Sequence, residues 1–130
     1  MEAHDPLTLA VATLLVALTF ILTPMAPGGL VDTRDFTPLP RWQFHLFNVF
    51  LISLGSVSLV VAGFSVAGAT WVYIPAIILG VLFAAVYALD LAQVFPVVPD
   101  RMPSQLLVLE VINLALAGVV IVVAIRGLLA

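Results

Sequence analysis

Two acidic residues stand inside segments that are otherwise apolar, and they are the first candidates for chemistry. Asp90 lies near the end of one such segment, and Glu110 lies in the first half of the next. An ionisable group at the centre of a bilayer costs at least about 2.5–3.5 kcal/mol to insert, so such residues usually face the interior of a helix bundle and carry function. If these two carboxyl groups meet, they can share a proton or bind a cation.

Polar neighbours of these acids extend the candidate site to three segments of the chain. Asn48 and Asn113 are expected to orient the carboxyl groups, while His45 and Tyr87 line the mouth of a polar pocket. The candidate substrate- or ion-binding residues are therefore His45, Asn48, Tyr87, Asp90, Glu110 and Asn113. The alternative interpretation is structural: hydrogen bonds within the bundle for the two acids, and an interfacial or helix-capping role for His45.

A metal site is a further possibility for the same residues. His45, Asp90 and Glu110 form a mixed nitrogen and oxygen set that is compatible with zinc, iron or manganese. Only one embedded histidine is available, because His4 belongs to the opposite side of the predicted membrane protein. A haem or two-metal site held by paired histidines of one chain is therefore not expected.

Several other kinds of site are absent from the sequence. There is no cysteine, which excludes disulfides, thiolate metal sites and cysteine catalysis. There is no lysine and the four arginines form no cluster, so we expect no nucleic-acid partner and no polybasic lipid patch. No phosphate-binding glycine loop, His-Glu-x-x-His zinc motif or Gly-x-Ser-x-Gly nucleophile motif occurs. The sequence therefore favours a protein that is not an enzyme.

Composition decides the environment in which these residues act. The chain has 130 residues, of which 64% are hydrophobic and 8% charged, against about 45–50% apolar and about 25% charged in soluble domains. So few charges cannot cover so much apolar surface in water, which predicts an integral membrane protein of the cell membrane with the lipid bilayer as its partner. The leading residues carry acids and no Lys or Arg, unlike a signal peptide, so the first apolar segment is expected to be retained.

Four apolar segments predict the elements that position the candidate residues. Asp5 and Pro6 are typical of a helix start, and proline-rich stretches separate the first segment from the second and the third from the fourth. The predicted helices span about 6–25, 41–67, 71–95 and 101–128. The fold class is an all-α membrane protein, a four-transmembrane-helix antiparallel bundle that forms one domain over residues 1–130.

Helical spacing predicts which residues share a face. In the second helix, a stripe runs through His45, Asn48, Ile52, Ser56, Leu59 and Gly63, and its polar end is expected to face the neighbouring helices. In the third, Tyr73, Gly80, Tyr87 and Asp90 form a stripe beside a ladder of small residues, Gly80, Ala84 and Ala88, that lets another helix come close. In the fourth, Leu106, Glu110, Asn113, Ala117 and Ile121 share a face.

Four spans place both termini on one side of the membrane and the two proline-rich loops on the other. All six candidate residues then lie in the half that is nearer these loops. Three of the four arginines, Arg34, Arg41 and Arg101, belong to the loop side, so the positive-inside rule places the loops in the cytoplasm and both termini outside.

These observations support three hypotheses of different classes. The leading one is a small transporter or channel with a carboxylate-lined polar pocket in one leaflet, coupled to protons or cations through Asp90 and Glu110. The second is a non-catalytic membrane subunit that stabilises a larger complex, in which the polar cluster holds the helices of the bundle together. The third is a membrane enzyme that acts on a lipid or quinone. A homo-oligomer or a membrane partner subunit is expected, because four short helices bury few faces.

Overall fold

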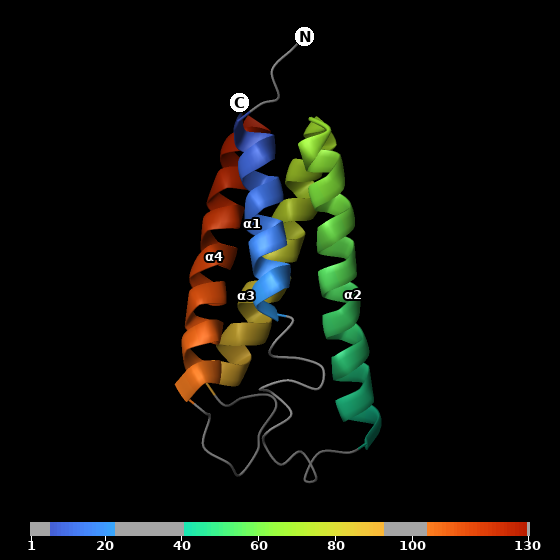
Figure 1. Cartoon of the computed structure of the whole chain (residues 1–130), viewed down its shortest axis with the longest axis vertical. Helices are drawn as coiled ribbons and strands as arrows, with labels where there is room; N and C mark the ends of the chain where they lie inside the picture. The colour runs from blue at the N-terminus through green and yellow to red at the C-terminus, as the bar shows by residue number, and fades with distance from the viewer. Residues whose placement is uncertain (1–5, 23–40, 93–103, 130) are drawn as a thin grey trace.

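The structure, a computed structural model, describes residues 6–22, 41–92 and 104–129, and nearly all of these residues are helical (Figure 1). The elements in chain order are α1 (Pro6–Leu22), α2 (Arg41–Val66), a short 3-10 helix η2 (Thr70–Val72), α3 (Tyr73–Leu91) and α4 (Ser104–Leu129). The four predicted helices are thus present. The predicted ends of the helices at residues 23–25, 93–95 and 101–103 lie outside the described residues.

The turn between α2 and α3 is closed by backbone hydrogen bonds that cap the end of α2. The amide of Gly68 donates to the carbonyl of Ser65, and the amide of Ala69 donates to the carbonyl of Phe64. Gly68 has a φ of 88°, a left-handed conformation that glycine adopts without steric cost, as the Schellman motif requires. The next turn places the ring of Trp71 5.1 Å from that of Phe64. We call the end of the bundle that holds this turn the turn end.

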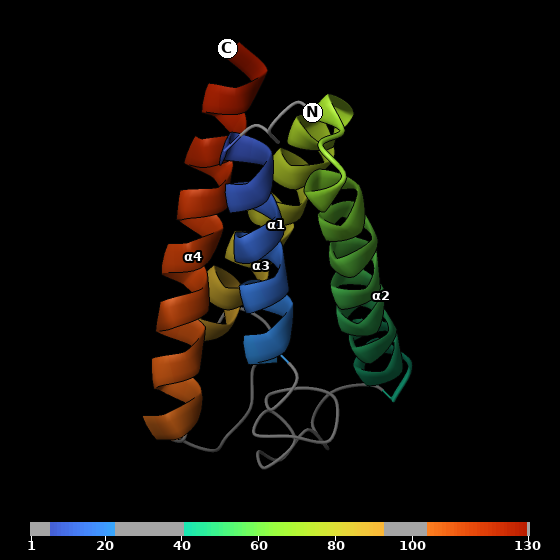
Figure 2. The ribbon, with the colours of Figure 1, turned by 45° about the horizontal axis from the view of Figure 1, so that its top comes forward.

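The helices run alternately up and down (Figures 1 and 2). The beginning of α1 and the end of α4 lie at the turn end, and α2 and α4 begin at the opposite end, which we call the far end. Helix α1 packs against both α2 and α4, and α3 packs along α4. Helices α2 and α3 meet at the turn and separate towards the far end, so they form an antiparallel hairpin that opens away from its turn.

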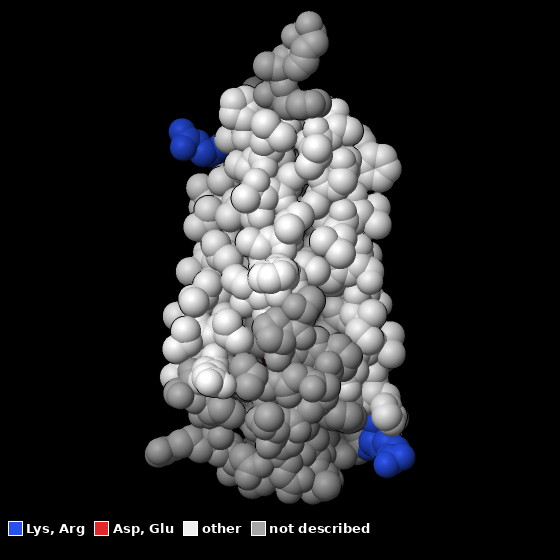
Figure 3. Space-filling view, in the orientation of Figure 1, with Lys and Arg blue, Asp and Glu red and all other residues white. Residues whose placement is uncertain are grey.

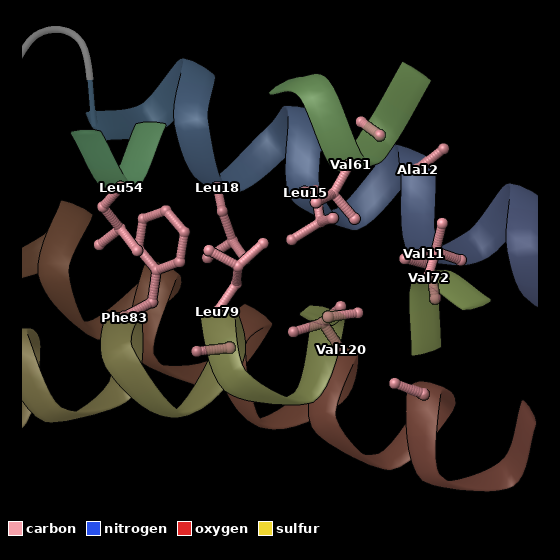
Figure 4. Packing of buried hydrophobic residues seen from close by; sticks show 14 of the residues in the cluster. Val11, Ala12, Leu15, Leu18, Leu54, Val61, Val72, Leu79, Phe83 and Val120 are labelled. Carbon is pink, nitrogen blue, oxygen red and sulfur yellow. The ribbon is translucent and has the colours of Figure 1, made fainter. Parts of the chain in front are cut away.

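Each helix buries residues that alternate three and four positions apart, which is the heptad spacing of left-handed helix bundles. On α3 this inner stripe consists of Tyr73, Ala76, Gly80, Phe83, Tyr87 and Asp90. On α4 it includes Glu110, Asn113, Ala117, Val120 and Ala124. Leu15 and Leu18 of α1 and Leu54 and Val61 of α2 meet these stripes in the shared core (Figure 4). All four residues of the predicted stripe, Tyr73, Gly80, Tyr87 and Asp90, are buried.

The polar end of the predicted α2 stripe faces the neighbouring helices only in part, because His45 is exposed whereas Asn48 has a buried Oδ1 atom. Ile52 is 52% exposed and Leu59 is 49% exposed, and His45, Ser56 and Gly63 are exposed as well. Asn48 is only half-buried. The buried residues of α2 belong to a different stripe, which is Leu51, Leu54, Ser58, Val61 and Ser65. This stripe faces the core because its leucines and valine pack towards α1. The polar Ser58 is tolerated there because its hydroxyl donates a hydrogen bond to the carbonyl of Leu54 at 2.7 Å.

Three helical segments are long and apolar enough to cross a membrane, namely Arg41–Val66, Thr70–Leu91 and Leu107–Leu129. Helix α1 is apolar but has 17 residues, about 26 Å at 1.5 Å per residue, which is slightly shorter than a hydrocarbon core of about 30 Å. Arg41 and Arg126 are the arginines of the described residues and lie at opposite ends of the bundle. The described surface between the two ends carries no charge on the face that Figure 3 shows.

Candidate functional site

Helices α3 and α4 pack in one antiparallel register along their length. The amide of Asn113 reaches the hydroxyl of Tyr87, and a Cβ atom added to Gly80 would meet the side chains of Val120 and Ile121. Near the turn end, a Cβ atom added to Gly127 would overlap the ring of Tyr73. In each pair the two residue numbers sum to about 200, so a step towards the far end moves up the chain on α3 and down the chain on α4.

This register places the two buried acids in one layer of the bundle. Asp90 is three residues beyond Tyr87 on α3, and Glu110 is three residues before Asn113 on α4. Because the helices are antiparallel, both steps lead towards the far end by about 4.5 Å at 1.5 Å per residue. Asp90 therefore lies at the same level as Glu110, and both lie nearer the far end than the hydrogen bond between Tyr87 and Asn113. We call these four residues together the polar layer.

Close packing of large against small side chains holds this register. Ala117 is fully buried opposite Phe83, and Gly80 lies against Val120. A Cβ atom on Gly80 would stand 2.6 Å from Cγ1 of Ile121 and 3.2 Å from the backbone oxygen of Ala117, so only glycine lets the helices approach this closely. The predicted close approach at Gly80 is thus made within the chain, against α4, while Ala88 of the same ladder is exposed.

Asn113 ties three helices together in the polar layer. Its side chain is fully buried, and its Nδ2 donates to the hydroxyl of Tyr87 at 2.8 Å and to the backbone carbonyl of Leu18, on α1, at 3.0 Å. A carbonyl oxygen can only accept a hydrogen bond, so the contact with Leu18 fixes which end of the amide is nitrogen. The sequence predicted that Asn113 is embedded, but it carries no signal for its partner, since that partner is a backbone atom.

The other end of the same amide is unsatisfied. The Oδ1 atom of Asn113 is buried, and no donor within the described helices forms a hydrogen bond to it. A buried acceptor without a donor costs about 1–3 kcal/mol, and native proteins leave few such groups unexplained. This amide oxygen can therefore accept a further hydrogen bond.

The two acids of the layer are almost completely removed from solvent. Glu110 is 2% exposed and Asp90 is 4% exposed, and the Glu110 carboxyl interacts electrostatically with the buried hydroxyl of Tyr87. Tyr87 itself stacks on Phe83, with ring centroids 6.2 Å apart, which fixes the direction of its hydroxyl. The layer therefore combines two carboxyl groups, a phenol and an amide oxygen, which can bind a proton or a hard cation.

The structure does not bring the remaining two candidates into the polar layer. His45 is exposed on α2 and Asn48 is half-buried on the same helix, while the four residues of the polar layer belong to α3 and α4. Within residues 6–22, 41–92 and 104–129, the acids and histidines form no group of three that would hold a metal ion. The predicted set of His45, Asp90 and Glu110 is thus not assembled, because α2 separates from α3 towards the far end.

An apolar groove occupies the opening between α2 and α3. It has a volume of about 220 Å³ and is lined by Phe47, Phe50, Leu82, Ala85, Val86 and Leu89. A wider hollow of about 530 Å³ continues along α2, where Phe47 and Phe50 are joined by Gln43 and Leu46. Sequence reasoning missed this groove because it arises from the divergence of two helices that are neighbours in the chain.

Comparisons with known proteins give a family but no annotated relative. Neither the curated proteins nor the solved structures contain a significant match to this chain. One family model matches residues 7–130, which covers all four helices. The chain therefore belongs to the family described as a domain of unknown function, DUF8051.

Proposed function

We propose that the protein is a four-span integral membrane transporter or channel whose polar layer binds a proton or a small cation. The single observation that carries the proposal is the burial of Asp90 and Glu110 at one level of facing helices, beside the Tyr87 and Asn113 hydrogen bond. Two carboxyl groups away from water are expensive unless a bound charge neutralises them. Proteins that retain such groups in membrane helices use them in ion pathways and proton relays.

The membrane placement in this proposal rests on length, composition and charge. Three helical segments have the length of a span, and α1 completes the bundle if its slightly shorter apolar length is accommodated by local thinning of the bilayer. With both termini on one side, the arginine count favours a cytoplasmic far end and external termini. The polar layer would then lie in the cytoplasmic leaflet.

A ligand-dependent stability measurement tests the proposal. The purified protein is unfolded thermally with added monovalent cations, divalent metals or lipids, and across pH, beside Glu110→Gln and Asp90→Asn. We expect a cation or proton to stabilise the wild type and expect either variant to lose this response while remaining folded. Asp100→Asn, an acid outside the described helices, is the matched control and should keep the response.

Transport itself needs a second readout. Proteoliposomes that contain the wild type should dissipate an imposed proton or cation gradient faster than empty vesicles, and Glu110→Gln should abolish the difference. If the variants only unfold, or if no ligand changes the stability of any form, the carboxyl groups serve packing. The protein would then be better described as a non-catalytic subunit that stabilises a larger complex, alone or as a homo-oligomer.

The apolar groove favours one second candidate, a protein that acts on a lipid or quinone. Its lining consists of aromatic and aliphatic side chains of α2 and α3, which suits a hydrocarbon tail. A photoreactive acyl lipid in nanodiscs should then label the segment from Leu82 to Leu89, and conversion of an added lipid or quinone would distinguish an enzyme from a transporter with a bound lipid.

A further inference from the structure

We propose that the ligand of the polar layer is a proton on Glu110, and that Oδ1 of Asn113 accepts the hydrogen bond from the protonated carboxyl. This inference rests on the proposed function and narrows its ligand from a proton or cation to a proton. Asn113 is then a positioning residue, which holds the neutral form of Glu110 in place. The reaction is a reversible transfer: the Glu110 carboxylate takes a proton from a hydronium ion, leaving water, and later returns a proton to water.

The hydrogen-bond inventory of Asn113 carries the inference. Both hydrogens of its Nδ2 are used, one by the carbonyl of Leu18 and one by the hydroxyl of Tyr87, and its Oδ1 is buried without a donor from the described residues. Glu110 precedes Asn113 by three positions on the same helix, which puts the two side chains on one face. A neutral carboxyl has an O–H to donate, whereas a carboxylate only accepts. Protonation of Glu110 therefore supplies the donor that Asn113 lacks.

The charged and titratable surroundings favour the same species. From α3, the described groups that face Glu110 are Asp90 and Tyr87. From α1, the neighbour of the layer is the carbonyl of Leu18, a hydrogen-bond acceptor, and the described part of α1 contains no titratable side chain. From α2, the described titratable groups are Arg41 and His45, which are both exposed, and Arg126 of α4 is exposed near the opposite end of the bundle from Arg41. Burial away from water favours the neutral form of a carboxyl group, and Glu110 is 2% exposed.

The space in the layer also favours a proton over a metal ion. A hard cation takes several oxygen ligands at defined distances, about six to eight for Ca²⁺. The four side chains of the layer are at most 4% exposed, so the water ligands that such a cation commonly keeps would also have to be buried. A proton requires no added volume.

Infrared difference spectroscopy in nanodiscs tests the inference, because it detects the carbonyl stretch of a neutral carboxyl directly. The chain has only two glutamates, Glu2 and Glu110, so ¹³C-labelled glutamate restricts the assignment to these two. At neutral pH the wild type should show a neutral carboxyl band that shifts on labelling. The band should be lost in Glu110→Gln and kept in Glu2→Gln and Asp90→Asn.

The role of Asn113 has its own readout. Asn113→Leu should move the Glu110 band to higher frequency, since the carboxyl loses its acceptor, and Asn113→Ser should return the band towards its original frequency by restoring an oxygen. Should Asn113→Leu fail to fold, the serine variant and Tyr87→Phe keep the test decisive. Tyr87→Phe leaves Oδ1 of Asn113 in place and should keep a hydrogen-bonded band.

The results separate this inference from the proposed function. If the wild type shows no labelled band at neutral pH, Glu110 is ionised and the inference fails. The proposed function survives that result if a cation still stabilises the wild type and not Glu110→Gln, and it fails with the inference if no cation or pH change does so. If Asn113→Leu folds and leaves the band unmoved, Asn113 does not accept a hydrogen bond from the Glu110 carboxyl, and its proposed positioning role is overturned.

Discussion

Helix α3 packs against α4 and α2 in two different ways. Against α4 it makes a continuous interface in which glycine and alanine alternate with large side chains, and in which the polar layer is enclosed. Against α2 it meets its neighbour near a tight turn and then separates, leaving an apolar groove. Helix α4, which follows α3 after a long connection, is thus packed more closely against α3 than α2 is, although only a short turn joins α2 to α3.

The difference shows that chain proximity sets direction but not packing. A capped turn obliges α2 and α3 to run antiparallel, yet Phe47 and Phe50 face Leu82, Ala85 and Val86 across a gap. On the other side of α3, Gly80 removes the atoms that would keep α4 away. In a membrane, where lipid tails are as apolar as side chains, such shape complementarity is a main source of helix association.

The largest contrast is expected between two phenylalanines on opposite sides of α3. Phe83 is fully buried between the helices, and Phe83→Ala should cost about 3–5 kcal/mol through the cavity it leaves. Phe50 is half-buried at the groove, so Phe50→Ala should cost much less. Reversible unfolding in a denaturing detergent measures both, and equal costs would mean that the groove is as well packed as the core.

The glycines provide the next contrast. Gly80→Ala should destabilise the protein by about 1–3 kcal/mol through overpacking, because the new Cβ atom meets side chains of α4 that are branched at Cβ and stiff. The matched controls are Gly63→Ala and Gly118→Ala, where no atom beyond the glycine's own neighbours and local helix backbone lies within 4 Å of the added Cβ. These controls should be neutral or stabilising by up to about 1 kcal/mol, as helix propensity predicts. A neutral Gly80→Ala would contradict the close approach.

The polar layer should give a smaller effect on stability. Asn113→Leu removes two interhelical hydrogen bonds, each worth about 0.6 kcal/mol on average and at most about 1.7 kcal/mol in a membrane protein. A double-mutant cycle with Tyr87→Phe should show a coupling free energy of this size. Asn48→Leu, outside the layer, should show no coupling with Tyr87→Phe.

Filling the groove should have the smallest effect. Ala85 is exposed and lines the groove, and Ala115 is an exposed alanine on α4. Ala85→Phe and Ala115→Phe should each change the free energy of unfolding by no more than about 0.5 kcal/mol. Only Ala85→Phe should reduce labelling by a photoreactive acyl lipid, and equal labelling of the two variants would exclude a hydrocarbon tail from the groove.

The sequence predicted the helices and the α3 stripe because these depend on local signals. Prolines and Gly68 mark helix ends, and the polar members Tyr87 and Asp90 stand out against an apolar background. The orientation of α2 could not be predicted in this way. Its core residues and its outward residues are both apolar, as Leu51 and Leu59 illustrate, so hydrophobicity does not distinguish the buried face of α2 from its exposed face.

The candidate site likewise contains residues that the sequence could predict and partners that it could not. Asp90, Glu110, Tyr87 and Asn113 were predictable because a polar residue in a span needs an interior position. His45 and Asn48 were expected beside them only because they belong to the same half of the bundle, and the divergence of α2 from α3 leaves them outside. The carbonyl of Leu18 was unpredictable, since a backbone acceptor leaves no trace in the residue type.

The most direct measurement is disulfide cross-linking of Asp90→Cys with Glu110→Cys. The chain has no cysteine of its own, so a pair introduced at these positions reports only their proximity, and a disulfide requires Cα atoms within about 7 Å. We predict rapid formation of an intramolecular disulfide on oxidation. Asp90→Cys with Ala117→Cys, displaced by one heptad or about 10 Å, should stay reduced. If the displaced pair cross-links instead, the register is wrong and the two acids do not share a layer.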